Sequence, residues 1–270
     1  MDLHGKVVVV TGAANGIGRA MALRFAAEDA RGVVVADLDA DGAATVAGHI
    51  NERRAGSALA VRCDVGVEAE VASLIARAED AFGPVDLFCA NAGVAVGTDP
   101  ATPDEVWDLA FNVNVKAHIY AARHLLPGWL ERGEGYFLAT ASAAGLLTQI
   151  GSAPYAVTKH AAVAFAEWLA VTYGDRGVRV SCLCPMGVNT NLLNAGVSPG
   201  GEGAAAAAVM AAGAVLEPAQ VGEVVVEALG DERFLILPHP DVLTFLQRKA
   251  NDYDRWLAGM RRLQARVTSN

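Results

Sequence analysis

The chain has 270 residues, of which 53% are hydrophobic, so it is long enough to bury a sizeable core as one large α/β domain. Acidic residues outnumber basic ones by 30 to 21, and the resulting net charge of -9 argues against nucleic-acid and anionic-membrane partners, which need clustered cations. We expect a soluble cytoplasmic protein without a metal site, because no stretch looks like a secretory leader or a membrane span and the four cysteines form no C-x-x-C pair.

Short apolar runs alternate with longer helical stretches along the chain. Strands are expected at residues 6–11, 32–37, 58–63, 85–90, 135–142, 178–184 and 234–237. Helices are expected at residues 17–30, 40–54, 67–82, 103–132, 153–174 and 218–229. Pro127 should kink or break the fourth helix near its end. Because the strands are apolar without alternation, the pattern predicts a single-domain α/β fold, a doubly wound parallel sheet of the Rossmann type with helices on both faces.

Two segments interrupt this alternation. Residues 189–216 are rich in Gly and Ala and long for a loop, which is typical of a substrate lid. From residue 241 to 270, apolar residues recur at spacings of three and four and predict a helical C-terminal extension. We expect this extension to pack on its own subunit or on a neighbouring one, and a role at a membrane surface is the alternative.

The first strand leads directly into a glycine-rich turn that opens a helix, with the sequence T-G-A-A-N-G-I-G at residues 11–18. Gly12, Gly16 and Gly18 let the chain turn tightly and let a pyrophosphate approach the backbone. The free N–H groups of the helix N-terminus then face the anion. A turn with packing duties alone is the other interpretation, but the strand before and the helix after favour a dinucleotide site.

The second strand ends in a carboxylate, Asp37, nineteen residues past Gly18. A carboxylate at this place accepts hydrogen bonds from an adenosine ribose and repels the additional phosphate of NADP. No Arg or Lys lies between Gly32 and Arg53, so we expect NAD as the cofactor.

A phenol and an amine follow each other on a predicted helix. Tyr155 and Lys159 are four residues apart, so they share one face. A free phenol has a pKa of ~10. A nearby ammonium, together with the positive charge of an oxidised nicotinamide, favours the phenolate and brings it into range as a general base. Ser142 closes the preceding strand, where its hydroxyl would hold a substrate oxygen beside Tyr155 or simply cap the chain turn.

Taken together, these motifs resemble the short-chain dehydrogenase/reductase family over residues 5 to about 238. The turn at 11–18 looks like the family's T-G-x-x-x-G-x-G loop, and Asp64 is similar to the acid that contacts adenine. The N-A-G run at 91–93 and the P-M-G-V-N-T run at 185–190 resemble the family's motifs beside the nicotinamide riboside. The resemblance implies this set of cofactor-binding residues: Gly12, Asn15, Gly16, Ile17, Gly18, Asp37, Asp64, Val65, Asn91, Ala92, Gly93, Tyr155, Lys159, Pro185, Val188 and Thr190.

The same resemblance implies a catalytic group of Ser142, Tyr155, Lys159 and Asn114. In the family, the residue matching Lys159 also grips the nicotinamide ribose, and the backbone of the matching asparagine holds a water in a proton relay. Asn112 competes with Asn114 for that place, but the spacing favours Asn114. Met186 departs from the family's glycine, so a positive backbone torsion there must be lost or moved to Gly187.

The substrate is expected to meet a mostly apolar surface. By distance from the motifs, the residues expected near it are Val94, Leu146, Gln149, Met186, Leu192 and Leu193. None of them is an Arg or Lys that would grip a carboxylate, so we expect a neutral, fairly hydrophobic secondary alcohol or ketone, with Tyr155 as general acid/base. The alternatives are an NADP-dependent carbonyl or 3-oxoacyl thioester reductase, and a nucleotide-sensing or scaffold protein without turnover.

Small residues on more than one face of the helices at 103–132 and 153–174 indicate burial against another subunit. Family relatives commonly form dimers or tetramers through the matching helices. We therefore expect a homotetramer, with a dimer as the alternative.

Overall fold

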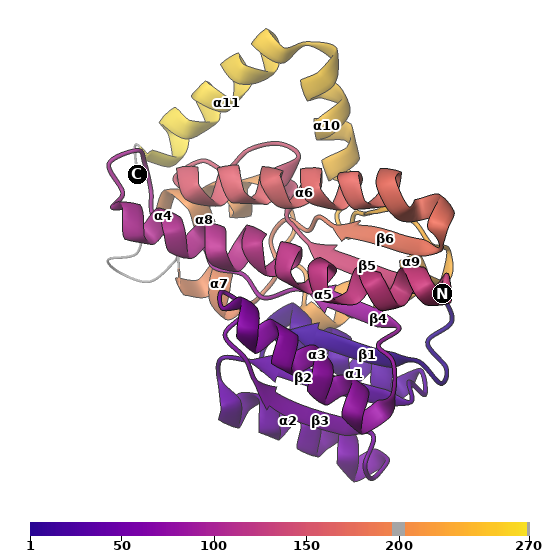
Figure 1. Cartoon of the computed structure of the whole chain (residues 1–270). Coiled ribbons are helices and arrows are strands. Elements are labelled where there is room, and N and C mark those ends of the chain that lie inside the picture. The colour runs from indigo at the N-terminus through magenta and orange to yellow at the C-terminus, as the bar shows by residue number, and fades with distance from the viewer. Residues whose placement is uncertain (196–202, 269–270) are drawn as a thin grey trace.

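A seven-stranded parallel sheet forms the centre of the computed structural model, which describes residues 1–195 and 203–268 (Figure 1). The strands are β1 (Val7–Thr11), β2 (Gly32–Asp37), β3 (Ala58–Arg62), β4 (Leu87–Ala90), β5 (Gly135–Thr140), β6 (Val178–Leu183) and β7 (Leu235–Ile236). Their order is β3-β2-β1-β4-β5-β6-β7, and all neighbours pair in parallel. The order reverses between β1 and β4, which is where a doubly wound sheet opens a ligand crevice at its carboxyl edge.

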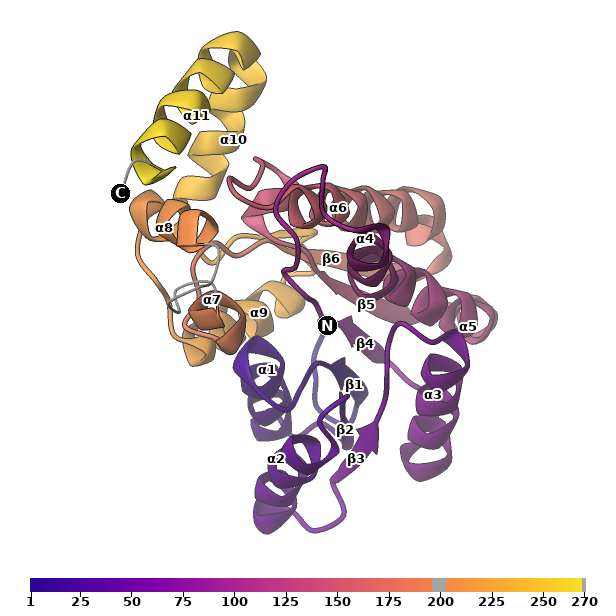
Figure 2. The same ribbon diagram turned by 90° about the vertical axis from the view of Figure 1, so that its left-hand side faces the viewer.

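Helices cover both faces of the sheet (Figure 2). One face carries α1 (Gly16–Ala27), α2 (Ala40–Arg53) and α9 (Pro218–Gly230). The other face carries α3 (Glu68–Phe82), α5 (Ala117–Arg132) and α6 (Ala153–Tyr173). The predicted fold class is confirmed.

The valine run of β1 shows why the strands lack alternation. Val8 and Val10 pack into the cluster under α1, α2 and α9, whereas Val7 and Val9 pack into the cluster under α3, α5 and α6. All four side chains are buried. Because each face of the sheet is covered by helices, successive residues of the strand enter two different cores.

The predicted helix at 103–132 has the right extent but is not uniform. It consists of α4 (Asp104–Phe111), a π-helical turn (Asn112–Lys116) and α5. The prediction that Pro127 breaks it is wrong, because α5 continues past this residue to Arg132. It ends at Gly133, whose φ of 67° is the left-handed conformation that commonly closes a helix.

Two short helices occupy the described part of the segment predicted as a loop. They are α7 (Asn191–Ala195) and α8 (Gly203–Ala212), and residues 196–202 lie outside the described residues. The C-terminal extension is also two helices rather than one, α10 (Asp241–Asn251) and α11 (Tyr253–Thr268). They stand above the sheet, and α11 returns to pack against α8 (Figures 1 and 2).

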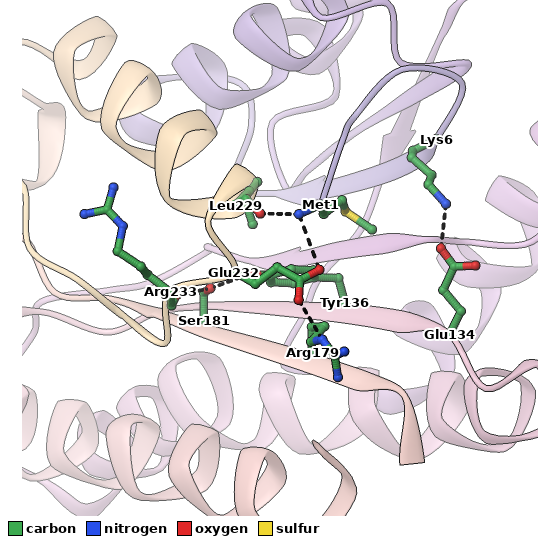
Figure 3. A network of polar contacts seen from close by, with 9 residues as sticks. All are labelled: Met1, Lys6, Glu134, Tyr136, Arg179, Ser181, Leu229, Glu232 and Arg233. Carbon is green, nitrogen blue, oxygen red and sulfur yellow. Dashed lines mark hydrogen bonds and ion pairs between the residues drawn. The ribbon is translucent and has the colours of Figure 1, made fainter. Parts of the chain in front are cut away.

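Polar groups at the amino edge of the sheet are used in structural contacts, as Figure 3 shows. Glu232 accepts a hydrogen bond from Arg179 at 2.8 Å and lies 3.5 Å from the Met1 ammonium. The hydroxyls of Tyr136 and Ser181 share a buried hydrogen bond of 2.7 Å. The polar side chains at this edge are therefore paired with one another. The polar side chains that line the cleft lie at the opposite, carboxyl edge of the sheet.

Candidate active site

The glycine turn after β1 is shaped by close backbone approach. Gly12 has a φ of 64°, and a Cβ there would lie 2.8 Å from the Cα of Ala92. A side chain at Gly18 would collide with the carbonyl of Gly12. Only glycine fits both positions. The turn can therefore pack closely against the chain after β4, and the N-terminus of α1 faces the cleft.

Asn91 holds this turn to the end of β4. Its Nδ2 donates to the carbonyls of Thr11 and Gly12 at 2.9 and 3.3 Å. The Thr11 hydroxyl accepts from the backbone N–H groups of Asn91 and Ala92 at 3.0 and 3.1 Å. The amide of Asn91 thus ties β1 to β4 at the point where the strand order reverses.

Two carboxylates lie at the ends of β2 and β3. Asp37 accepts the backbone N–H groups of Ala14 and Asp39 at 2.9 and 3.0 Å, which fixes its side chain at the cleft. Asp64 accepts the N–H of Gly66 at 2.9 Å and also lines the cleft. The glycine turn leaves no room for side chains, the N-terminus of α1 faces the cleft, and a carboxylate stands at the end of β2. These three features fit a dinucleotide.

Ser142, Tyr155 and Lys159 come together where β5 meets α6. The Ser142 hydroxyl accepts the N–H of Ala144 at 3.1 Å, so it does cap the turn, and it donates to the carbonyl of Pro185 at 3.5 Å. The Lys159 Nζ donates to the carbonyl of Thr140 at 3.0 Å and lies 5.6 Å from the centre of the Tyr155 ring. All three side chains line the same cleft.

Burial controls both ionisations in this group. It raises the pKa of Tyr155, and the neighbouring Ser142 hydroxyl offsets that rise only in part. It lowers the pKa of Lys159 to about 8, because only 3% of this residue is exposed. The sequence interpretation expected the ammonium and an oxidised nicotinamide together to lower the pKa of the phenol. In the protein without nucleotide, desolvation sets the direction of the shift.

Asn114 lies behind this group in the π-helical turn. Its Oδ1 accepts the N–H of Val94 at 2.9 Å, and its Nδ2 donates to the carbonyl of Val94 and the hydroxyl of Thr158. A Cβ on Gly93 would be 3.3 Å from both the Asn114 Oδ1 and the Lys159 Nζ. Asn114 is thus buried between the loop after β4 and α6, while its own side chain does not line the cleft.

The loop after β6 is held by a histidine that motif reasoning did not identify. The His239 Nδ1 accepts the N–H of Met186 at 3.2 Å, and Nε2 lies 3.1 and 3.2 Å from the carbonyls of Gly187 and Ala214. Since carbonyls only accept, the hydrogen of the imidazole is on Nε2. Neither Met186 nor Gly187 has a positive φ, so the torsion expected from the family's glycine is lost here.

Comparison with known proteins decides the family. The family model described as short chain dehydrogenase matches residues 6–198. A 1-deoxy-11-beta-hydroxypentalenate dehydrogenase of Streptomyces exfoliatus is 37% identical over 256 residues, which cover 93% of this chain and 90% of that protein. The chain belongs to the short-chain dehydrogenase/reductase family. It is therefore an oxidoreductase of a family that uses a nicotinamide cofactor.

Other relatives of this short-chain dehydrogenase belong to the same family. A 3beta-hydroxysteroid dehydrogenase 2 of Eggerthella lenta is 32% identical over 194 residues, covering 70% of this chain and 74% of that protein. A short-chain dehydrogenase/reductase of Burkholderia phymatum, solved in complex with NAD, superposes with a TM-score of 0.85 at 32% identity over 94% of this chain and 96% of its own. A 3-ketoacyl-(acyl-carrier-protein) reductase of Brucella melitensis, solved in complex with NADH, superposes with a TM-score of 0.76 at 30% identity. The match covers 87% of this chain and 96% of that protein.

One cleft of about 1220 Å³ collects nearly all the residues singled out in the sequence of this dehydrogenase. Each of the predicted cofactor-binding residues lines it, and so do Val94, Gln149, Met186, Leu192 and Leu193. Leu146 does not line the cleft, because it turns into the core under α6, and Leu147 lines the cleft instead. Gln149 donates to the carbonyls of Ile150 and Ala205, so its amide holds α8.

The cleft also has a wall that the family motifs could not reveal. Phe245, Trp256, Met260, Leu263 and Arg266 of the C-terminal extension line it. They lie beyond the residues 5–238 that carry the family motifs, and the spacing of three and four predicted a helical segment there without indicating which of its faces lines the cleft. In residues 1–195 and 203–268, no helix is long and apolar enough to cross a membrane.

Proposed function

We propose that this enzyme transfers a hydride between NAD and a secondary alcohol or its ketone that is neutral and fairly hydrophobic around the reacting carbon. The observation that carries the proposal is the convergence of Ser142, Tyr155 and Lys159 on a cleft whose other end holds Asp37. The names of two relatives, for a hydroxypentalenate and a 3beta-hydroxysteroid, support a substrate that bears a hydroxyl group.

The cofactor would lie along the carboxyl edge of the sheet. In this proposal the turn at Gly12–Gly18 would receive the pyrophosphate, Asp64 would contact the adenine, and Thr190 would contact the nicotinamide. Asp37 accepts hydrogen bonds from the adenosine ribose, and its charge disfavours the additional phosphate of NADP. The complexes of two structural neighbours with NAD and NADH support the same choice.

Bound nicotinamide supplies the hydride acceptor or donor. The Ser142 hydroxyl holds the substrate oxygen, and Tyr155 removes the hydroxyl proton during oxidation or returns it during reduction. Lys159, with a pKa of about 8, is still largely protonated at neutral pH and stabilises the phenolate. The backbone at Asn114 holds a water through which Lys159 exchanges its proton with solvent.

A reductase of 3-oxoacyl thioesters that prefers NADP is the second candidate. The 3-ketoacyl reductase neighbour speaks for the thioester substrate, whereas its complex with NADH speaks against NADP. Asp37 and the absence of basic residues between Gly32 and Arg53 favour the first candidate. We also propose a homotetramer, with a dimer as the alternative. Trp168 and Val171 of α6 are 54% and 88% exposed in the single chain, which supports burial of this helix against another subunit.

The test is a screen of secondary alcohols with NAD and with NADP, followed by the absorbance of the reduced cofactor. We expect bulky apolar alcohols to reduce NAD at least tenfold more efficiently than NADP. A preference for NADP, or oxidation of small hydroxy acids alone, would contradict the proposal. Light scattering at micromolar concentration tests the tetramer, which a monomer mass would exclude.

A further inference from the structure

The C-terminal helices form a wall of the same cleft that contains Tyr155. Trp256, Met260 and Leu263 of α11 line it, and Phe245 of α10 lies beside them. These three residues of α11 are spaced by four and three, so they form one stripe along the helix. The side of the cleft that the extension forms is therefore apolar.

A buried lysine fixes this wall in place. The Lys249 Nζ donates to the carbonyls of Leu146 and Leu147 at 2.7 and 2.8 Å, just after the Ser142 turn. It also lies 5.1 Å from the ring centre of Trp256 and 5.5 Å from that of Tyr253. Only 8% of the lysine is exposed. The extension is thus tied to the segment that carries the Ser142 hydroxyl.

The apolar stripe ends in a cation. Arg266 follows Leu263 by three residues and lines the cleft, whereas Arg255, Arg261 and Arg262 of the same helix do not. Within residues 1–195 and 203–268, no acidic side chain forms an ion pair with Arg266. A guanidinium presents donors in a planar fork that matches a carboxylate.

We propose that the substrate is a large apolar secondary alcohol or ketone with a carboxylate at its remote end, and that Arg266 binds this carboxylate. The inference rests on the proposed function for the reacting end and adds the chemistry of the other. Among the described residues that line the cleft, Lys159 is the other basic side chain, and it lies at the reacting end. One guanidinium on an apolar wall suits a single carboxylate better than a phosphate ester, which carries more charge.

The experiment measures binding of one probe pair to the full-length enzyme saturated with NADH, so that no turnover occurs. The pair is a steroid-sized fused-ring secondary alcohol with a carboxylate on the ring farthest from the hydroxyl, and its methyl ester. We expect calorimetry to show that the acid binds about fivefold more tightly than the ester, which is the upper range for an exposed ion pair. Raising the salt concentration should reduce this preference.

Variants assign the preference to one side chain. Arg266→Met should bind acid and ester equally, and Arg266→Lys should keep part of the preference, because it retains the charge without the fork. Arg261→Met removes an equal charge from the same helix and should keep the full preference. Equal binding of acid and ester by the wild type, or loss of the preference in both methionine variants, would overturn the inference.

The same preparations separate this inference from the proposed function. NADH formation from the methyl ester and NAD reports the chemistry at the reacting end. Absence of NADH with every alcohol would refute the proposed function, while the binding pair would still decide the role of Arg266.

Discussion

The Lys159 ammonium nitrogen lies 5.6 Å from the centre of the Tyr155 ring and donates a hydrogen bond to the carbonyl of Thr140. Burial raises the pKa of the phenol and lowers the pKa of the amine to about 8. Both shifts favour the uncharged forms in the protein without nucleotide. The phenolate is therefore not preformed, and we infer that the positive charge of the oxidised nicotinamide is needed beside it.

Asp37 should determine the choice between the two dinucleotides. Replacing Asp37 by Ser removes the negative charge at the end of β2, so we expect the ratio of kcat/KM for NAD over NADP to fall at least tenfold. Steady-state rates with both cofactors measure this ratio. Asp41→Asn removes a charge from an exposed position on α2 and should leave the ratio unchanged. An unaltered ratio in the Asp37 variant would exclude its role.

His118 should make the fold sensitive to acid. Burial, aided by the charge of Lys159, lowers the pKa of this histidine to about 3, and both ring nitrogens are buried without a hydrogen-bond partner among the described residues. Below pH 6.5 the unfolded chain binds a proton at this position that the folded chain does not, so stability is lost as the pH falls. Between pH 7 and 5 the expected loss is about 2 kcal/mol.

Urea unfolding at the two pH values measures this loss. A His118→Leu variant should lose about 2 kcal/mol less than the wild type over the same interval. It also replaces two buried nitrogens that lack partners, which offsets part of the change in packing. An identical pH dependence in variant and wild type would show that other groups cause the acid sensitivity.

His239 should position the loop after β6. His239→Leu leaves the N–H of Met186 and the carbonyls of Gly187 and Ala214 without their partner. We expect the KM for NAD to rise about tenfold and the free energy of unfolding to fall by about 2 kcal/mol, the usual cost of buried groups that lose their hydrogen bonds. Steady-state kinetics and urea unfolding test this together.

The pH gives an independent readout for His239. Burial lowers the pKa of the imidazole, although its contacts with Ala214 and Gly187 oppose this. Protonation below that pKa removes the acceptor for Met186, so the KM for NAD should rise as the pH falls below the histidine's usual range. The leucine variant should lack this rise. If the KM of the wild type stays constant down to pH 5, the histidine is merely structural.

Lys249 should hold the wall of the substrate cleft. Lys249→Met removes the donors to Leu146 and Leu147, so the extension should loosen. We expect the KM for a steroid-sized alcohol to rise about tenfold, and to rise less for 2-butanol, which does not reach the wall. Arg248→Met alters the exposed neighbour and serves as the matched control. Equal effects on both alcohols would mean that the lysine acts elsewhere.

Local patterns in the sequence predicted the sheet and the glycine turn that lines the cleft, because those features depend on local spacing. The valine run of β1 and the glycines at 12, 16 and 18 indicate their surroundings directly. The π-helical turn at 112–116 was not predicted, because such turns are rare and occur as single insertions within segments that are otherwise α-helical.

The rest of the site depends on long-range packing that no local motif records. Leu146 and Leu147 are adjacent apolar residues, and only the path of the chain after Ser142 decides which of them faces the cleft. His239 meets Met186 across 53 positions of the chain. Arg266 lies beyond the motifs that resemble the family, so its place in the cleft was not predicted. The sequence predicted a pocket without a cation, whereas the guanidinium of Arg266 lines the cleft.

Tyr155→Phe tests the central claim most directly, because it removes one oxygen and keeps the ring on α6. With a bulky secondary alcohol and NAD, we expect kcat to fall about a thousandfold, within the range for loss of a general acid/base. Binding of NADH, followed by its fluorescence, should stay within about twofold of the wild type. Turnover within about tenfold of the wild type, with NADH still bound, would contradict the assignment of Tyr155 as the proton-transferring group.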